Sequence, residues 1–183
     1  MPVFVALLRG VNVGGNQKLP SAVLKACCER AGGTSVRTYL QSGNVVFASE
    51  ESSADRMAAA IRAEVKKAVG FEVAVLIRTG AELKKVIAKN PFADAARENG
   101  GKVFVVFLQE PAGATAKAAL EKDRVDPEEL HYDGRHLYAS LPNGAGRSKV
   151  AQDFTPRKLG SDCTARNWNT VVALSELAAE TGK

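Results

Sequence analysis

The sequence lacks any long apolar segment. No uninterrupted apolar run in its 183 residues is longer than Val103–Leu108, which is far too short to cross a bilayer. The N-terminus carries neither a basic segment nor an apolar stretch of signal-peptide length, so we expect no secretion signal. These absences argue against export and against a membrane partner.

Cysteine is also scarce. The three cysteines, Cys27, Cys28 and Cys163, are odd in number and form no C-x-x-C pair, which argues against a disulfide framework, a zinc ribbon and a thioredoxin-like motif. A reducing cytoplasm fits this pattern best. The G-x-S-x-G and H-E-x-x-H motifs of hydrolases are missing too. The sequence therefore assigns no catalytic residue and no cofactor.

Charge and aromatic content restrict the partners. The net charge is +5, from 25 Lys and Arg against 20 Asp and Glu, which is compatible with phosphate-bearing partners. The basic residues are spread along the chain, and only 6% of the residues are aromatic, so no base-stacking surface for RNA is indicated. The hydrophobic content of 45% is ordinary for a globular protein with a real core.

The first half of the chain has the pattern of a ferredoxin-like unit. Buried or β-branched runs predict strands at residues 3–8, 36–41, 44–48 and 72–77. Helical periodicity predicts helices at residues 21–31 and 54–69, the second one capped by Ser52 with Asp55 and ended by Gly70. The resulting order β-α-β-β-α-β is the split βαβ arrangement.

The second half begins in the same way. A short helix at residues 81–89 and a polar linker at 93–102 precede a strand at 102–108 and a helix at 114–121. Asp133-Gly134 predicts a hairpin between residues 129–132 and 135–139, and helical patterns follow at 148–154 and 165–179, without a convincing fourth strand. We expect an α+β fold of two ferredoxin-like halves, each an antiparallel sheet with helices packed on one face. Its divisions are expected at residues 1–80, 81–102 and 103–183.

The loop between the first strand and the first helix, residues 9–20, is a candidate anion site. It is rich in glycine and polar side chains and precedes a helix N-terminus, where free N–H groups and a positive dipole end attract anions. It is not a P-loop, because Asn16 and Gln17 stand where that motif needs Lys and then Ser or Thr. The alternative is a loop whose glycines only provide backbone angles.

Topology predicts that a second segment lies beside this loop. In a ferredoxin-like sheet the first loop and the turn of the first hairpin lie at the same edge, and the first and third strands are neighbours. We therefore expect polar residues from both segments to form one ligand-binding edge: Arg9, Asn12, Gly14, Gly15, Lys18, Ser42, Gly43 and Asn44.

Two further segments of the second half combine polar and basic residues. In GAGRSK, residues 144–149, Ser148 is expected to cap a helix, and Arg147 and Lys149 lie near its positive end, so these three residues are candidates to bind a phosphate or carboxylate. In TARNWNT, residues 164–170, Thr164 is expected to cap the last helix, and Arg166, Asn167 and Asn169 are candidate ligand-binding residues. A flexible connection and structural bracing are the respective alternatives.

The two histidines flank the predicted second hairpin turn. His131 and His136 are expected to lie opposite each other, with Glu129 on the same face, and such a trio could hold a divalent metal. The alternative is the solvated face of a hairpin whose leucines pack inward. We assign no metal site.

Five strings occur in order along the chain: ALLRGVNVGG, TYLQSGNVVF, NPF, GAGRSK and TARNWNTV. With them the chain resembles the bacterial family known as domain of unknown function 1697, from Phe4 to Leu177. The resemblance implies an α+β fold built on ferredoxin-like halves and supplies no activity, substrate or cofactor. In this family the helix before Gly160 typically lacks a proline, so Thr155-Pro156 is expected to break residues 148–159 into two pieces.

The favoured function is a cytoplasmic binding module for an anionic or phosphate-bearing ligand at the edge formed by residues 9–20, with a nucleotide or RNA as the most natural ligand. One alternative is a small-molecule enzyme with a pocket between the two halves. Another is a structural or partner-binding protein without a small ligand. The oligomeric state is left open.

Overall fold

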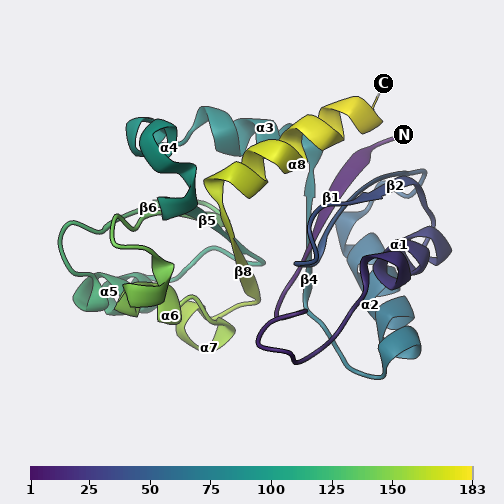
Figure 1. Ribbon diagram of the computed structural model, residues 1–183, viewed down its shortest axis with the longest axis horizontal. Helices are drawn as coiled ribbons and strands as arrows, with labels where there is room; N and C mark the ends of the chain where they lie inside the picture. The colour runs from purple at the N-terminus through teal and green to yellow at the C-terminus, as the bar shows by residue number, and fades with distance from the viewer. Residues whose placement is uncertain (183) are drawn as a thin grey trace. The chain divides into compact units, whose positions relative to one another are not determined.

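The computed structural model describes residues 1–182, which form two four-stranded antiparallel sheets and their helices (Figure 1). The strand orders are β2-β3-β1-β4 and β6-β7-β5-β8, so the same topology is built twice. This confirms the expected α+β fold with two ferredoxin-like halves.

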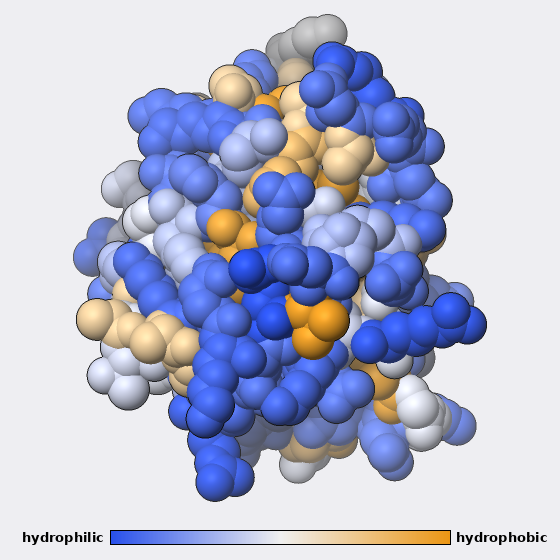
Figure 2. All heavy atoms as spheres, turned by 90° about the vertical axis from the view of Figure 1, so that its left-hand side faces the viewer, coloured by the Kyte–Doolittle hydropathy of each residue, from blue (hydrophilic) through white to orange (hydrophobic). Residues whose placement is uncertain are grey.

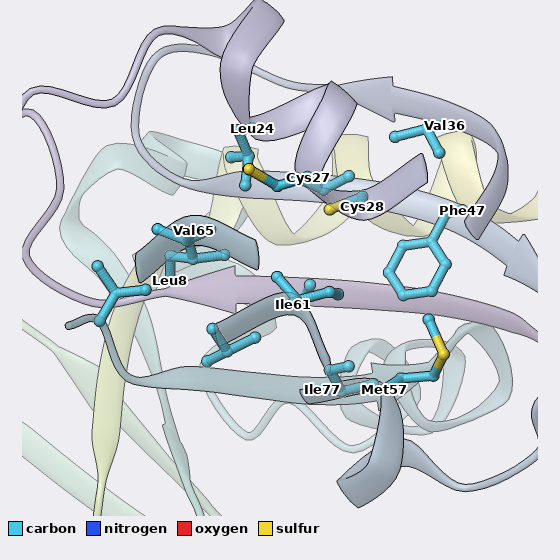
Figure 3. Packing of buried hydrophobic residues seen from close by; sticks show 14 of the residues in the cluster. Leu8, Leu24, Cys27, Cys28, Val36, Phe47, Met57, Ile61, Val65 and Ile77 are labelled. Carbon is cyan, nitrogen blue, oxygen red and sulfur yellow. The ribbon is translucent and has the colours of Figure 1, made fainter. Parts of the chain in front are cut away.

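The first sheet is covered on one face by two helices. Its elements are β1 (Val3–Leu8), α1 (Ser21–Arg30), β2 (Gly33–Thr38), β3 (Asn44–Ser49), α2 (Ala54–Val69) and β4 (Val75–Thr79). Met57, Ile61 and Val65 recur every four residues on α2 and are buried in the core (Figure 3). Burying such side chains stabilises the fold by roughly 1.5–3 kcal/mol each.

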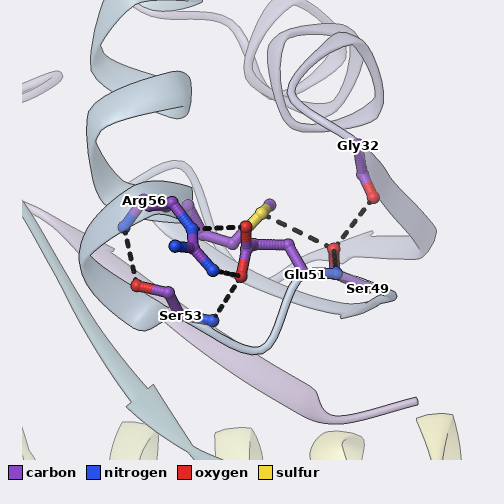
Figure 4. A network of polar contacts seen from close by, with 6 residues as sticks. Gly32, Ser49, Glu51, Ser53 and Arg56 are labelled. Carbon is purple, nitrogen blue, oxygen red and sulfur yellow. Dashed lines mark hydrogen bonds and ion pairs between the residues drawn. The ribbon is translucent and has the colours of Figure 1, made fainter.

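A network of polar contacts fixes the start of α2 (Figure 4). Ser53 Oγ accepts a hydrogen bond from the Arg56 amide at 3.3 Å, so the cap is Ser53 and the prediction of Ser52 was wrong. Glu51 accepts bonds from the Arg56 guanidinium at 2.6 and 2.8 Å and from the Ser53 amide at 2.7 Å. These donors, the guanidinium first, lower the pKa of Glu51 to about 2.

The second sheet repeats this plan with shorter helical segments. Its elements are β5 (Val103–Leu108), α5 (Ala114–Asp123), β6 (Glu129–Asp133), β7 (His136–Ser140), α6 (Lys149–Gln152), α7 (Pro156–Leu159) and β8 (Cys163–Asn167). Leu120, Val150 and Leu159 bring α5, α6 and α7 into one core with strand residues. Pro156 begins α7 after Thr155, which confirms the expected break.

Two predictions about the second half were wrong. The fourth strand exists: β8 pairs with β5 along residues 163–167, where a helix start had been expected. Its Arg and Asn residues have low strand propensity, but pairing with a buried central strand outweighs it. The second wrong prediction is the polar linker at residues 93–102, which folds into α4 (Ala93–Asn99) and the 3-10 turn η1 (Gly100–Lys102). A second 3-10 turn, η2 (Ala145–Arg147), precedes α6.

The chain forms two compact units. One contains residues 1–85 and α8 (Trp168–Thr181) from Ala173 onward, and the other is Val86–Val172. Helix α3 (Gly80–Ala88) therefore begins in the first unit and ends in the second, while α8 does the reverse. Within the first unit, Arg37 Nη1 of β2 is 2.6 Å from Glu180 Oε2 of α8.

None of the helices within residues 1–182 has both the length and the apolar character needed to cross a membrane.

Candidate functional site

The first loop contains a miniature hairpin. The Asn16 amide donates to the Val13 carbonyl at 3.1 Å, and the Asn12 amide donates to the Gln17 carbonyl at 3.1 Å. Between them Gly14 and Gly15 have φ angles of 59° and 77°, which suit a type I′ turn. The two glycines are thus explained by the backbone geometry of the turn.

Asn12 joins the loop to the hairpin turn of the same unit. Its Nδ2 donates to the Leu19 carbonyl at 2.9 Å and to the Gln41 carbonyl at 2.7 Å, and its Oδ1 accepts from the Leu19 amide at 2.8 Å. Its φ of 56° is a left-handed angle that asparagine tolerates better than most residues. Because its amide group is used within the protein, Asn12 positions the loop.

Gly43 closes the same edge from the hairpin side. Its carbonyl accepts a hydrogen bond from the Leu8 amide at 2.8 Å. A Cβ atom at Gly43 would lie 2.6 Å from Val11 Cγ2 and 2.8 Å from Leu8 Cβ, and the φ angle is 74°. Only glycine fits at this close approach between the loop and the turn.

The neighbouring predicted residues also have structural contacts. Asn44 is fully buried, and its Nδ2 donates to the Tyr39 carbonyl at 3.0 Å and to Ser42 Oγ at 2.8 Å. The Arg9 amide donates to the Ala74 carbonyl at 3.0 Å. The predicted proximity of the first loop and the hairpin turn is confirmed by the contacts of Asn12 and Gly43. We call residues 9–20 and 39–44 together the first-loop edge.

The first-loop edge is exposed and strained. Residues 13–18, including Lys18, are all exposed. Two large apolar side chains, Val13 and Leu40, are 65% and 59% exposed. Non-glycine residues with positive φ are Asn12, Gln17, Ser35 and Leu40, and all but Ser35 belong to this edge. Such strain costs on the order of 1–3 kcal/mol per residue and clusters at functional sites.

The N-terminus of α1 opens from this edge. Its N-cap, Pro20, provides no side-chain hydrogen bond, and the first turn has no acidic residue. The amides of Ser21, Ala22 and Val23 have no acceptor among the described residues, since the first amide bonded back is that of Leu24 to Pro20. These groups offer donors and a positive dipole end to an anion.

The predicted residues in GAGRSK lie in the second unit. Ser148 Oγ accepts from the Ala151 amide at 3.1 Å, so Ser148 caps α6 as expected. Lys149 Nζ forms a short ion pair with Asp123 of α5, and Lys158 Nζ is 3.3 Å from Asp153. The hydrogen bond from the Lys149 ammonium group is the main reason why the pKa of Asp123 lies below its usual value. Arg147 is exposed in η2.

The predicted residues in TARNWNT also lie in the second unit, where the structure changes their roles. Thr164 lies in β8 and does not cap a helix. Asn167 caps α8, because its Oδ1 accepts a hydrogen bond from the Thr170 amide at 2.9 Å. Asn169 packs against Gly100, where a Cβ would lie 2.1 Å from Asn169 Oδ1. These contacts are structural, and ligand binding by this group stays a prediction.

Arg166 is a strand residue with a counterpart that the sequence analysis missed. It pairs with Val105 and donates from Nη1 to Thr164 Oγ1 at 2.7 Å and to the Ala165 carbonyl at 2.8 Å. Burial lowers its pKa to about 10. Arg78 is at the equivalent position of the first half: it pairs with Val5, is fully buried and donates to the Ile77 carbonyl at 2.9 Å. An arginine inside the apolar run VLIRT was the signal for it.

The two histidines do not lie opposite each other. The register pairs His131 with Tyr138 and His136 with Asp133, so the turn residues are Gly134 and Arg135. His136 instead contacts the Phe107 ring edge-on, with centroids 5.6 Å apart. Within residues 1–182 there is no group of three His, Cys, Asp or Glu residues arranged to hold a metal ion.

Known proteins share the fold of this chain. A conserved bacterial protein, SP0830 from Streptococcus pneumoniae, aligns with a TM-score of 0.76 at 19% sequence identity, over 97% of this chain and 98% of that chain. At this identity the likeness shows the fold alone. No match was found among curated proteins. The model of the family described as protein of unknown function (DUF1697) matches residues 1–138, and the chain therefore belongs to that family.

Proposed function

We propose that the protein is a cytoplasmic binding module whose first-loop edge takes a phosphate-bearing ligand. The observation that carries this proposal is the length of the β1–α1 connection, residues 9–20, against residues 109–113 for the equivalent β5–α5 connection. The fold closes this position with a short connection in the second half, so it does not require the extra residues in the first.

Equivalent hydrogen bonds support this comparison of the two connections. Leu8 donates to Gly43 at 2.8 Å, as Leu108 donates to Arg135 at 2.9 Å. Arg9 donates to Ala74 at 3.0 Å, as Gln109 donates to Asp162 at 2.8 Å. The starts of the two connections are thus held alike, and the additional residues of the first connection include those of the exposed miniature hairpin.

The chemistry of the edge suits a phosphate group with an apolar substituent. Three free amides at the start of α1 provide donors, and Lys18 provides a positive charge close to them in the sequence. Exposed Val13 and Leu40 add apolar surface for a base or sugar. A nucleotide or a short RNA fits this combination better than inorganic phosphate alone. All three cysteines are free and buried, in keeping with a reducing compartment.

Calorimetric titration of ATP and of a short single-stranded RNA tests the proposal. Lys18→Ala should weaken binding about tenfold, the value of one charge-assisted contact. Lys25→Ala is the matched control, because Lys25 is an exposed residue of α1 whose Nζ is 3.9 Å from Glu29. Affinity should also fall as salt increases. Equal losses in both variants, or no heat with either ligand, would contradict the proposal.

A further inference from the structure

Strand β6 leaves an open edge on the second sheet. It pairs only with β7 among the described strands, and its five residue pairs run without a bulge. The edge strand β2 of the first sheet differs, because a register shift between Thr34 and Arg37 interrupts its pairing. Strand β6 also lacks proline and lysine, two common means of protecting an edge.

The register identifies the backbone groups that face outward. Asp133 and His136 close a two-residue hairpin, so they form a hydrogen-bonded pair, and the pairs at His131 and Glu129 follow the same alternation. Leu130 and Tyr132 therefore direct their N–H and C=O groups away from β7. Within residues 1–182 no further strand pairs with them.

Two open cavities adjoin β6, one beside the end of α5 and one beside the start of α4. One, of about 590 Å³, is lined by the end of α5 and the segment that follows it, including Arg124 and Pro127. The other, of about 510 Å³, is lined by residues at the start of α4, including Phe92, and by His131. Both include Glu129 and Leu130, and both volumes are in the range of about 300–1,000 Å³ typical of ligand clefts.

The lining is acidic although the chain carries a net charge of +5. Glu121, Asp126, Glu128 and Glu129 line the first cavity beside a single cation, Arg124, which is already held at 3.0 Å by Glu121 and at 2.7 Å by Asp126. Glu129, His131 and Asp94 line the second, where Asp94 also forms an ion pair with Arg97. The face of the molecule in Figure 2 is largely hydrophilic, with apolar spots near its centre and a larger apolar area toward the top of the view. The carboxylates of the lining favour a partner with basic side chains.

We propose that β6 binds an extended basic segment of a partner protein, which adds to the sheet as a strand. The partner's main chain pairs with Leu130 and Tyr132. Consecutive side chains of a strand point to opposite faces, so two adjacent basic residues place one Lys or Arg side chain in each acidic cavity. A second copy of β6 is a poor occupant, because it would bring its own Glu129 against these carboxylates. The inference is independent of the first-loop edge.

Fluorescence anisotropy of a labelled peptide, Val-Thr-Lys-Arg-Thr-Val, tests this surface on the full chain. Saturable binding is expected, and N-methylation of the peptide nitrogens that face β6 should weaken it about tenfold or more, because it removes main-chain hydrogen bonds. Glu129→Gln should weaken binding about fivefold. Glu98→Gln, on exposed α4 and outside both cavities, should leave it unchanged.

Three outcomes would overturn the inference. The first is no saturable binding at millimolar protein. The second is equal affinity for the N-methylated peptide, or for spermine, which would show a general acidic surface without strand pairing. The third is an unchanged affinity in Glu129→Gln with its circular dichroism spectrum intact.

Discussion

The two halves of the molecule have the same strand order but differ in the length of two connections at one edge of the sheet. In the first half the β1–α1 and β2–β3 connections span residues 9–20 and 39–43. In the second half the corresponding segments are residues 109–113 and 134–135. Since the strand order and the anchoring hydrogen bonds are the same, the fold needs only the shorter versions. The longer connections set the first-loop edge apart from its counterpart in the second half, and the proposed ligand site is based on this difference.

The largest expected loss of stability comes from adding a side-chain atom where the first loop and the hairpin turn pack closely together. Gly43→Ala places a Cβ against Val11 and Leu8 at a φ of 74°, and should destabilise the protein by about 3 kcal/mol. Gly14→Ala is the matched control: its φ is 59°, but no atom lies within 4 Å of the added Cβ, so about 1 kcal/mol is expected. Urea denaturation measures both. Equal losses would show that packing between loop and turn is unimportant.

A smaller effect is expected from loosening the loop. Asn12→Ala removes three hydrogen bonds, to Leu19 twice and to Gln41 once, which should cost about 2–3 kcal/mol. Asn16→Ala changes an exposed side chain of the same loop and should remain within about 0.5 kcal/mol of the parent. If ligand affinity stayed unchanged in Asn12→Ala, the loop would not need to be held in place for binding.

The smallest expected effect is a change of stability with pH, and it concerns a further similarity between the two halves. In each half a carboxylate of lowered pKa forms an ion pair with a basic residue of the helix that follows its hairpin. In the first half Glu51 pairs with Arg56 of α2, and in the second half Asp123 pairs with Lys149 of α6. The folded pKa of Glu51 is lowered from 4.5 to about 2. Its contribution to stability is therefore fully present above pH 4.5 and is lost as pH falls toward about 2.

Glu51→Gln should accordingly be less stable than the parent at pH 6, and the difference should shrink as the solution is acidified below pH 4.5. Chemical denaturation at a series of pH values measures this, with the exposed neighbour Glu50→Gln as control. A difference that stays constant down to pH 2 would assign the stabilisation to a group other than the Glu51 carboxylate.

Most of the fold could be predicted because its strands and helices follow simple periodic patterns. The runs in β1 and β5 and the fourfold spacing of Met57, Ile61 and Val65 are of this kind. Strand β8 could not, because Arg166 and Asn167 carry no strand signal and only pairing with β5 makes them extended. Helix α4 begins at Ala93, and its N-cap Phe92 provides no capping side chain, so the start of the helix was not visible in the sequence either.

The candidate site was partly predictable for the same reason. Topology alone brought the first loop and the hairpin turn together, and Asn12 and Gly43 make the contacts. The sequence could not show that the Asn12 amide group is used internally, because that depends on where the carbonyls of Leu19 and Gln41 lie. Nor could it show the strain at Leu40, since leucine gives no sign of a positive φ.

The central claim is that the first-loop edge binds phosphate through the free amides of α1. Its most direct test is a ¹H–¹⁵N NMR titration of the assigned protein with inorganic pyrophosphate and then with ATP. The account predicts that the largest shifts occur at Ser21, Ala22 and Val23 and at residues 14–18 of the loop. Shifts concentrated at Arg147 and Lys149, or no saturable shift anywhere, would contradict it.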